Sequence, residues 1–294
     1  MSASQTTLNP NTLIIGLSGP SSSGKTTLAR LLRQIFHPTL KLFILHEDDF
    51  YKTDKDIPRK QFSSQAFGKR ELDDWDCVES LDLPLLQRVL SHVRSTGRLP
   101  DDFSSKEDQN AVGESGVSQD DIVKHAQEVK DWVERVSQGG NDKQFTICIV
   151  DGFLLFPDPN CEIGSGEREL FEILEPLLDL KLFLPSSRAK TIDRRTKRTG
   201  YVTLEGFWED PPGYVEDVVW PNYARDHAWL FEAAGHGDEV DVRKAVDEGR
   251  VDRVTAEKHG VLVGPGMGDA HLSEILPWAI ERIKQSVSES IRQQ

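Results

Sequence analysis

The chain has 294 residues and a formal net charge of −14, and 37% of its residues are hydrophobic while 29% are charged. This length suits one large α/β domain or two small ones, and the apolar fraction is sufficient for a sizeable core. Nucleic acids and anionic membranes carry negative charge, so the acidic balance argues against broad binding to either. We therefore expect no nucleic-acid and no membrane partner.

Cys77, Cys148 and Cys161 lie far apart in the sequence, which indicates neither a disulfide framework nor a zinc site. Residues 1–11 carry no basic stretch followed by an apolar one, and we expect them to be flexible. No apolar run approaches the roughly 20 residues of a membrane span. We expect a cytoplasmic protein, with the nucleus as the alternative location.

Short apolar runs alternate with helical patterns along the chain. The runs cover residues 12–17, 41–46, 145–156, 179–185 and 260–264. A helix is expected from near Lys25, between the first two runs. This alternation predicts a doubly wound, mostly parallel α/β sheet whose ligands bind at the carboxyl ends of the strands.

Residues 16–30, GLSGPSSSGKTTLAR, contain the pattern G-x-x-x-x-G-K-[ST] between the first strand and this helix. Glycines allow backbone N–H groups to surround a phosphate, and the helix N-terminus adds partial positive charge. Lys25 is expected at the β- and γ-phosphates, and the Thr26 hydroxyl at Mg²⁺. The predicted nucleotide-binding residues are Gly19, Ser21, Ser22, Ser23, Gly24, Lys25, Thr26 and Thr27.

Two acidic residues, Asp48 and Asp49, directly follow the predicted strand at 41–46. A carboxylate at this edge can orient and deprotonate an attacking hydroxyl, or approach Mg²⁺. The adjacent Phe50 and Tyr51 suit a flat ring or a sugar face. A solvated acidic turn is the alternative.

Trp75 and Asp76 stand just before a helical run at 78–90. Asp76 suits the N-cap of that helix. It also suits hydrogen bonding to two vicinal hydroxyls, with Trp75 as a stacking face. Both roles are compatible with the sequence.

Residues 96–144 form a long polar stretch, which we interpret as an acidic surface insertion. Its first half, residues 101–116, is typical of a mobile loop. Its second half predicts an amphipathic helix after a capping box at Ser118 and Asp121. The apolar residues at helical spacing are Ile122, Ala126, Val129, Val133 and Val136.

Asp151 ends the apolar run that begins at residue 145. A P-loop enzyme keeps a second acidic residue in this position, bonded to Mg²⁺ or its waters. A turn at the end of the strand is the alternative.

Residues 186–200 concentrate six basic residues within an acidic chain. Such a cluster can form a lid over transferring phosphates, because arginine binds phosphate oxygens bidentately. A solvated basic helix is the alternative. We favour the lid and assign residues 186–222 to a lid and substrate region.

Two segments complete the chain. Residues 235–260 are charged and are expected to form a second surface insertion. Leu276, Ile280, Ile283 and Val287 predict a closing helix on the core, with Pro277 in its first turn.

These motifs together resemble the nicotinamide riboside kinases, in the uridine-kinase-like branch of small-molecule P-loop kinases. The matching segments, in chain order, are GxSGxxxSGKTTLA (16–29), DDFYK (48–52), WD (75–76), DGFLLF (151–156), RR-x-x-R (194–198) and PPGYxxxxVWPNY (211–223). The resemblance implies a single kinase domain over residues 1–294, with a three-layer α/β/α fold of the P-loop NTPase type. It also implies that ATP phosphorylates the 5′-hydroxyl of a nicotinamide nucleoside, giving the mononucleotide used in NAD synthesis.

The same resemblance implies roles for individual residues. Asp48 would be the general base, assisted by Lys25, and Asp76 would bind the ribose 2′- and 3′-hydroxyls. Mg²⁺ would be held by Thr26, Asp48 and Asp151. The substrate side would further include Asp49, Phe50, Tyr51, Trp75, Arg195 and Tyr201. Arg194 and Arg198 would contact ATP, and the adenine-side loop would fall near residues 264–267.

The chain departs from the family pattern in several places. Asp151 stands where the family has glutamate, and the connection between the lid arginines and PPGY is longer. The sequence GPGMG at 264–268 matches the adenine-side loop poorly. Both insertions lack a counterpart in the compact family members.

Two other functions remain open on the sequence. A uridine or cytidine kinase of the same fold would share the phosphate loop and the arginine lid, although WD and DGFLLF favour the nicotinamide interpretation. A non-catalytic nucleotide-binding regulatory protein is the second alternative. Its weakness is that Lys25, Thr26, Asp48 and Asp151 are all retained. The sequence does not identify a protein partner.

Overall fold

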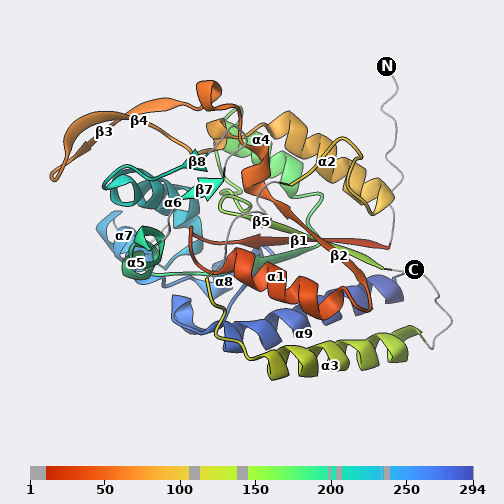
Figure 1. The fold of residues 1–294 in the computed structure, drawn as a ribbon. Helices are drawn as coiled ribbons and strands as arrows, with labels where there is room; N and C mark the ends of the chain where they lie inside the picture. The colour runs from red at the N-terminus through yellow and green to blue at the C-terminus, as the bar shows by residue number, and fades with distance from the viewer. Residues whose placement is uncertain are drawn as a thin grey trace, which may run out of the picture.

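The computed structural model describes residues 11–105, 113–137, 145–197, 200–202, 207–232, 234 and 239–293. Residues 1–10, which belong to the expected flexible N-terminus, lie outside this part of the chain. Five strands form one sheet in the order β2-β5-β1-β6-β9, and every pairing in it is parallel (Figure 1). The strands are β1 (Thr12–Ser18), β2 (Lys41–His46), β5 (Thr146–Gly152), β6 (Leu180–Phe183) and β9 (Val261–Val263). The predicted doubly wound, mostly parallel α/β sheet is confirmed.

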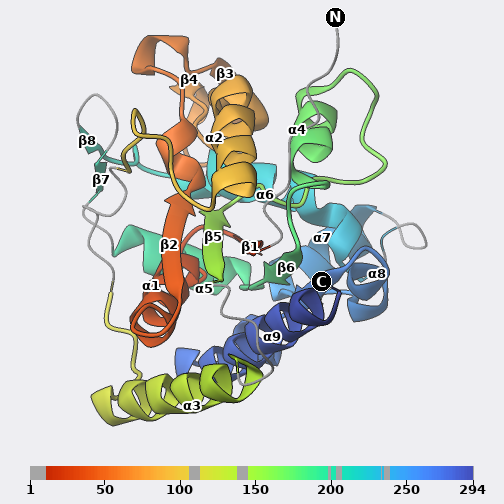
Figure 2. The same ribbon diagram turned by 90° about the vertical axis from the view of Figure 1, so that its right-hand side faces the viewer.

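Helices cover both faces of the sheet, which gives three layers (Figures 1 and 2). One face carries α1 (Lys25–Phe36) and α9 (Leu272–Arg292), and the other carries α2 (Leu83–Thr96), α4 (Gly166–Leu174), α6 (Trp220–His227) and α7 (Glu239–Glu248). The side chains of β1 alternate between two hydrophobic cores, since Ile14 joins one and Leu13 and Ile15 join the other. Shorter helices are α5 (Arg188–Thr196) and α8 (Arg253–Lys258).

The direction of winding reverses at β1. Strands β2 and β5 lie on one side of it, while β6 and β9 lie on the other. In open α/β sheets, ligands bind at such a switch point, beyond the carboxyl ends of the strands. The phosphate loop begins directly after β1 and therefore lies at the expected edge.

The predicted helix of the acidic insertion is present as α3 (Gln119–Ser137). It packs against α1, outside the layer of α1 and α9 (Figure 2). The Ser118 hydroxyl accepts from the Asp121 backbone N–H at 3.1 Å, as a helix cap does. Ile122, Val129 and Trp132 are buried against the core, so one face of the insertion adds to the hydrophobic interior.

The predicted strand at 145–156 ends earlier, at Gly152. The backbone N–H groups of Phe153 and Leu154 donate to Glu47 Oε2, at 2.7 and 2.9 Å. A Cβ at position 152 would lie 2.5 Å from the same oxygen, so this close approach requires glycine. Glu47 thus replaces the next hydrogen bonds of the sheet and lets the chain turn away.

Two further expectations differ from the structure. The 235–260 segment is not only surface decoration, because Ala245, Val246, Val251 and Ala256 are buried in the core. Helix α9 begins at Leu272, which places Pro277 inside the helix rather than in its first turn. The predicted apolar residues begin at Leu276, one turn after the helix itself begins.

Two antiparallel hairpins lie outside the sheet. One pairs β3 (Arg59–Ser64) with β4 (Gly68–Asp73) and projects from the body of the molecule, and the other pairs β7 (Tyr201–Val202) with β8 (Phe207–Trp208) (Figure 1). Neither hairpin was predicted. In the described part of the chain, no helix is long and apolar enough to traverse a bilayer.

Candidate active site

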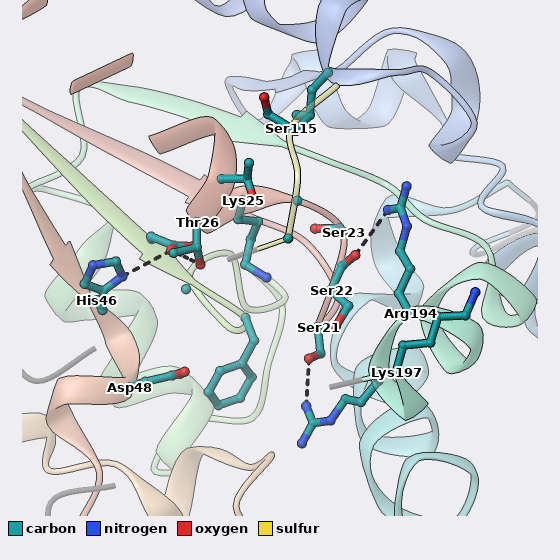
Figure 3. Close-up of a pocket in the computed structure, with 18 of the residues that line it drawn as sticks. Ser21, Ser22, Ser23, Lys25, Thr26, His46, Asp48, Ser115, Arg194 and Lys197 are labelled. Carbon is teal, nitrogen blue, oxygen red and sulfur yellow. Dashed lines mark hydrogen bonds and ion pairs between the residues drawn. The ribbon is translucent and has the colours of Figure 1, made fainter. Parts of the chain in front are cut away.

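A cavity of about 560 Å³ lies at the carboxyl edge of the sheet, in front of the phosphate loop (Figure 3). Its walls come from several elements that are far apart in the sequence. They are residues 21–27, the segment after β2, the loop before α2, residues 113–116, the end of β5, the end of α5, β8 and the first turns of α9. The structure therefore brings together most of the predicted site residues.

The phosphate loop has the backbone conformation that phosphate binding needs. Gly19 and Gly24 have φ angles of 148° and 101°, and a Cβ on Gly19 would lie 2.2 Å from the Leu184 carbonyl oxygen. Helix α1 begins at Lys25 without a side-chain cap, so its first N–H groups remain available to an anion. The Lys25 ammonium donates to the Pro20 carbonyl at 3.0 Å and points into the cavity (Figure 3).

Thr26 and Asp151 are in direct contact beneath this loop. The Thr26 hydroxyl donates to Asp151 Oδ2 at 2.5 Å, and His46 Nδ1 lies 3.2 Å from the same oxygen. Burial alone would raise the pKa of Asp151, but the hydrogen bond with His46 and the charge of Lys25 lower it below the usual range. Asp151 is thus an ionised strand-end carboxylate rather than part of a solvated turn.

Asp48 and Asp49 both line the cavity, on a 3₁₀ turn that spans Glu47–Phe50. Burial and the nearby Asp151 raise the pKa of Asp48, against the opposing charge of Lys25. A carboxylate with a raised pKa is a better proton acceptor at neutral pH.

The prediction that Phe50 contacts substrate is wrong. Side chains three residues apart eclipse in a 3₁₀ turn, so Glu47 and Phe50 point to the same side, which is the interior. Phe50 is fully buried and stacks on Phe103, with ring centroids 5.2 Å apart. Burial also raises the pKa of Glu47 to about 8.

The oxygen donors of Thr26, Asp48 and Asp151 fit Mg²⁺. This ion prefers hard oxygen ligands and keeps several waters or substrate phosphates as its remaining ligands. Among the described residues, no cluster of three or more His, Cys, Asp or Glu side chains could hold a metal ion by itself. The arrangement therefore suits a Mg²⁺ ion that arrives together with nucleotide phosphates.

Four aromatic rings form the opposite wall of the cavity. The Trp75 ring centroid lies 5.2 Å from that of Tyr51 and 5.5 Å from that of Trp208. Phe153 stacks on Tyr51 at 6.2 Å. Trp75 and Tyr51 were predicted, whereas Trp208 and Phe153 were missed. Such a group of faces suits a flat ring, and a positively charged one in particular.

Asp76 lies in the cavity and is not a helix cap. Helix α2 begins at Leu83, and Asp82 caps it by accepting from Leu85 N at 3.0 Å. Asp76 Oδ1 instead lies 3.9 Å from Arg195 Nη1. Burial raises the pKa of Asp76 to about 7, although Arg195 opposes the shift.

Basic side chains of α5 close the phosphate side. Arg194 Nη1 donates to the Ser22 carbonyl at 3.2 Å (Figure 3). Arg195 Nη1 donates to the Ser21 hydroxyl at 2.7 Å. Asp210, which was not predicted, accepts from Arg195 Nε and Nη2 at 2.7 and 3.0 Å. The predicted contacts of Arg198 and of the Tyr201 side chain lie outside the described residues.

Two segments that were not predicted also reach the cavity. Residues 113–116, from the acidic insertion, line it above the phosphate loop, where Ser115 is seen (Figure 3). Ala270, His271 and Leu272 line it at the start of α9. The adenine-side wall was expected near residues 264–267, and the described lining begins a few residues later.

Comparison with known proteins decides the family. The chain is 36% identical to the nicotinamide riboside kinase of Schizosaccharomyces pombe over 220 residues. These residues are 75% of this chain and 81% of that protein. The chain belongs to the nicotinamide riboside kinase family. The family member from Saccharomyces cerevisiae is 31% identical over 234 residues, or 79% of this chain and 85% of that protein. A scan against models of known families finds no match.

The similarity to uridine kinases is much shorter. The uridine kinase of Mycoplasma genitalium is 32% identical over 81 residues, which is 28% of this chain and 38% of that protein. Membership of the nicotinamide riboside kinase family, by contrast, rests on most of the chain. The resemblance found in the sequence motifs is therefore confirmed.

Proposed function

We propose that this chain transfers the γ-phosphoryl group of ATP to the 5′-hydroxyl of nicotinamide riboside, with Mg²⁺, and so makes nicotinamide mononucleotide for NAD synthesis. The observation that carries the proposal is one cavity with a phosphate loop on one wall and aromatic rings beside Asp76 on the other. The family membership supports the same reaction.

In this proposal, Asp48 accepts the proton of the attacking hydroxyl. Its raised pKa favours this role, and its carboxylate points into the cavity opposite Lys25 (Figure 3). Lys25 offsets negative charge on the β- and γ-phosphates, and Arg194 and Arg195 approach from the lid side. Bound by Thr26, Asp48 and Asp151, Mg²⁺ would supply further positive charge at the same phosphates.

The acceptor would lie against the aromatic wall. The nicotinamide ring of the riboside is cationic, and aromatic faces attract cations. Trp75, Tyr51 and Trp208 offer such faces. Asp76 can accept hydrogen bonds from the ribose 2′- and 3′-hydroxyls once it is ionised. The free cysteines fit a reducing compartment, and we place the reaction in the cytoplasm, with the nucleus as the alternative.

A coupled ADP-release assay tests the proposal. It compares nicotinamide riboside, uridine and cytidine as acceptors, with ATP and Mg²⁺ present. We expect kcat/KM to be at least about tenfold higher for nicotinamide riboside, because the uncharged bases lack the attraction to the aromatic wall. A preference for uridine or cytidine would overturn the specificity, and no turnover with any acceptor would overturn the kinase function.

A further inference from the structure

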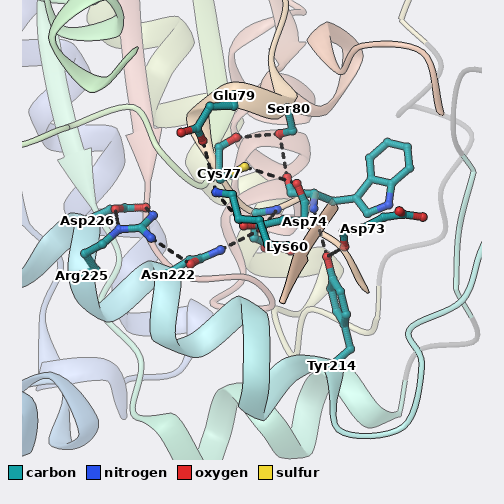
Figure 4. Close-up of polar contacts among 12 residues, drawn as sticks. Lys60, Asp73, Asp74, Cys77, Glu79, Ser80, Tyr214, Asn222, Arg225 and Asp226 are labelled. Atoms are coloured by element: carbon teal, nitrogen blue, oxygen red, sulfur yellow. Dashed lines mark hydrogen bonds and ion pairs between the residues drawn. The ribbon is translucent and has the colours of Figure 1, made fainter. Parts of the chain in front are cut away.

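The loop from Asp73 to Cys77 carries both Trp75 and Asp76, yet it belongs to no helix or strand along most of its length. Its backbone is bonded by two side chains from outside the loop, Tyr214 and Ser80, and by the loop's own Asp74 and Cys77 (Figure 4). Because this loop lies beside the cavity, whatever fixes its backbone also sets where the Asp76 carboxylate points.

Tyr214 holds one half of the loop. Its hydroxyl accepts from the Trp75 backbone N–H at 3.0 Å and donates to the Asp73 carbonyl at 3.0 Å. The tyrosine is fully buried, and burial raises its pKa, so the hydroxyl keeps the proton that it donates. Tyr214 belongs to the motif PPGYxxxxVWPNY. This motif contributed to the family resemblance, but no role was assigned to its tyrosine.

Asp74 holds the other half. Its side chain is fully buried, and Oδ1 accepts from the Asp76 backbone N–H at 3.2 Å. The Asn222 amide donates to the same oxygen at 2.8 Å, and the Lys60 ammonium lies 3.1 Å from Oδ2. Asn222 comes from α6 and from the same motif, and Arg225 Nη1 fixes it by donating to its Oδ1 at 3.1 Å.

The far end of the loop is held in the same way. Ser80 Oγ lies 2.9 Å from the Trp75 carbonyl and 2.6 Å from the Cys77 carbonyl. The Cys77 thiol donates to the Asp74 carbonyl at 3.3 Å. Loop residues 73–77 therefore have side-chain partners for several consecutive backbone groups, which is unusual for a segment outside regular structure.

We propose that Tyr214 and Asn222, the latter through Asp74, are positioning residues that fix the 73–77 loop so that Asp76 meets the ribose hydroxyls of the acceptor. The proposal rests on the proposed function. Neither residue lines the cavity, so each acts through the loop and not on substrate. The two ends of the motif thus hold the same loop and with it the Asp76 carboxylate. Tyr214 bonds the backbone at Asp73 and Trp75, and Asn222 holds Asp74, whose Oδ1 accepts from the Asp76 N–H.

The test uses Tyr214→Phe in the full chain, because this change removes one hydroxyl and keeps the ring. Tyr223→Phe is the matched control, since Tyr223 is a buried tyrosine nearby whose hydroxyl has no hydrogen-bond partner among the described residues. Each variant is assayed with a ribonucleoside and with its 2′,3′-dideoxy analogue, using whichever nucleoside the wild type phosphorylates. KM for ATP is measured alongside.

We expect Tyr214→Phe to raise the ribonucleoside KM about fivefold or more, the effect of one well-placed hydrogen bond, with KM for ATP within about twofold. With the dideoxy analogue the effect should shrink below about twofold, because Asp76 then has no hydroxyl to bind. Asn222→Ala should likewise raise the KM for the ribonucleoside more than the KM for the dideoxy analogue. In an Asp76→Asn background, Tyr214→Phe should add little.

Equal losses with both acceptors would overturn the proposal, as would a ribonucleoside KM unchanged in Tyr214→Phe or raised equally in Tyr223→Phe. These outcomes leave the proposed function intact, because the wild type still phosphorylates the nucleoside. A wild type without turnover on any nucleoside would instead overturn the proposed function, and this inference with it.

Discussion

The phosphate side and the acceptor side of the cavity are built in different ways. Residues 21–27 on the phosphate side form one continuous stretch, and their geometry follows from Gly24 and the helix N-terminus within it and from Gly19 just before it. The acceptor wall takes its aromatic rings from four separate places, at Tyr51, Trp75, Phe153 and Trp208. A local motif can specify the first side, whereas only long-range packing can specify the second.

The largest loss of activity is expected on replacing Asp48, which lies between the phosphate side and the acceptor side. Replacement Asp48→Asn keeps the shape of the cavity and removes the proton acceptor, so we expect kcat to fall about 10³-fold with the KM for the nucleoside nearly unchanged. Asp54→Asn, at an exposed position in the next turn, is the control. Steady-state ADP release measures both. A kcat within about threefold of the wild type would exclude Asp48 as the base.

The acceptor side should depend on pH through Asp76. The ionised carboxylate accepts hydrogen bonds from both hydroxyls, and the pKa of Asp76 is raised to about 7. We expect kcat/KM for the nucleoside to rise as the pH increases through about 7. Asp76→Asn should lower kcat/KM about 30-fold at high pH and reduce this rise. If the pH profile of kcat/KM is the same in Asp76→Asn as in the wild type, the titrating group is not Asp76.

Asp210 links the phosphate side to the acceptor side, and its replacement should lower activity less than the two changes above. Asp210 holds Arg195 through two hydrogen bonds and accepts from the Trp208 indole at 3.0 Å. Asp210→Asn should weaken both, and we expect kcat/KM to fall about tenfold. Asp102→Asn serves as the control, because Asp102 pairs with Arg88 at an exposed position outside the cavity lining. Equal activity of the two variants would show that Arg195 keeps its catalytic position without the hydrogen bonds to Asp210.

The smallest effect concerns stability away from the cavity. Burial lowers the pKa of His227 from 6.5 to about 4. The unfolded chain therefore binds more protons than the folded one in this window, and the free energy of unfolding should fall as the pH drops through it. The loss should be on the order of 3 kcal/mol.

His227→Phe tests this expectation, because phenylalanine keeps a ring beside Phe183 and Tyr223 without a titrating group. Urea unfolding at about pH 7 and about pH 4.5 should give a smaller difference for the variant than for the wild type. An equal difference would assign the acid sensitivity to other groups.

The same contrast explains what could be predicted from the sequence. The parallel sheet, α1, α3 and the phosphate loop were predicted because each depends on periodicity or on a motif within a few residues. Phe50 was misplaced because the sequence does not reveal which side of a short 3₁₀ turn a residue faces. Its neighbours Asp48 and Asp49 were expected at this edge of the sheet because they follow a strand directly, and both line the cavity.

Trp208 and Asp210 were missed for a different reason. Trp208 lines the cavity and Asp210 holds Arg195 only because the segment before PPGY folds back onto α5, which is a tertiary contact. The end of the strand at Gly152 was missed because it depends on Glu47, more than a hundred residues earlier. A buried carboxyl that replaces sheet hydrogen bonds leaves no local signal.

The pairing of Trp75 with Trp208 has an optical consequence. Two of the six tryptophans line the cavity, with ring centroids 5.5 Å apart. Indoles at this separation couple their electronic transitions, and a pyridinium ring accepts electrons from an excited indole. Intrinsic fluorescence should therefore be quenched when a nicotinamide nucleoside enters, and near-ultraviolet circular dichroism should change with it. The chain thus contains its own spectroscopic reporter of acceptor binding, which needs neither a label nor turnover.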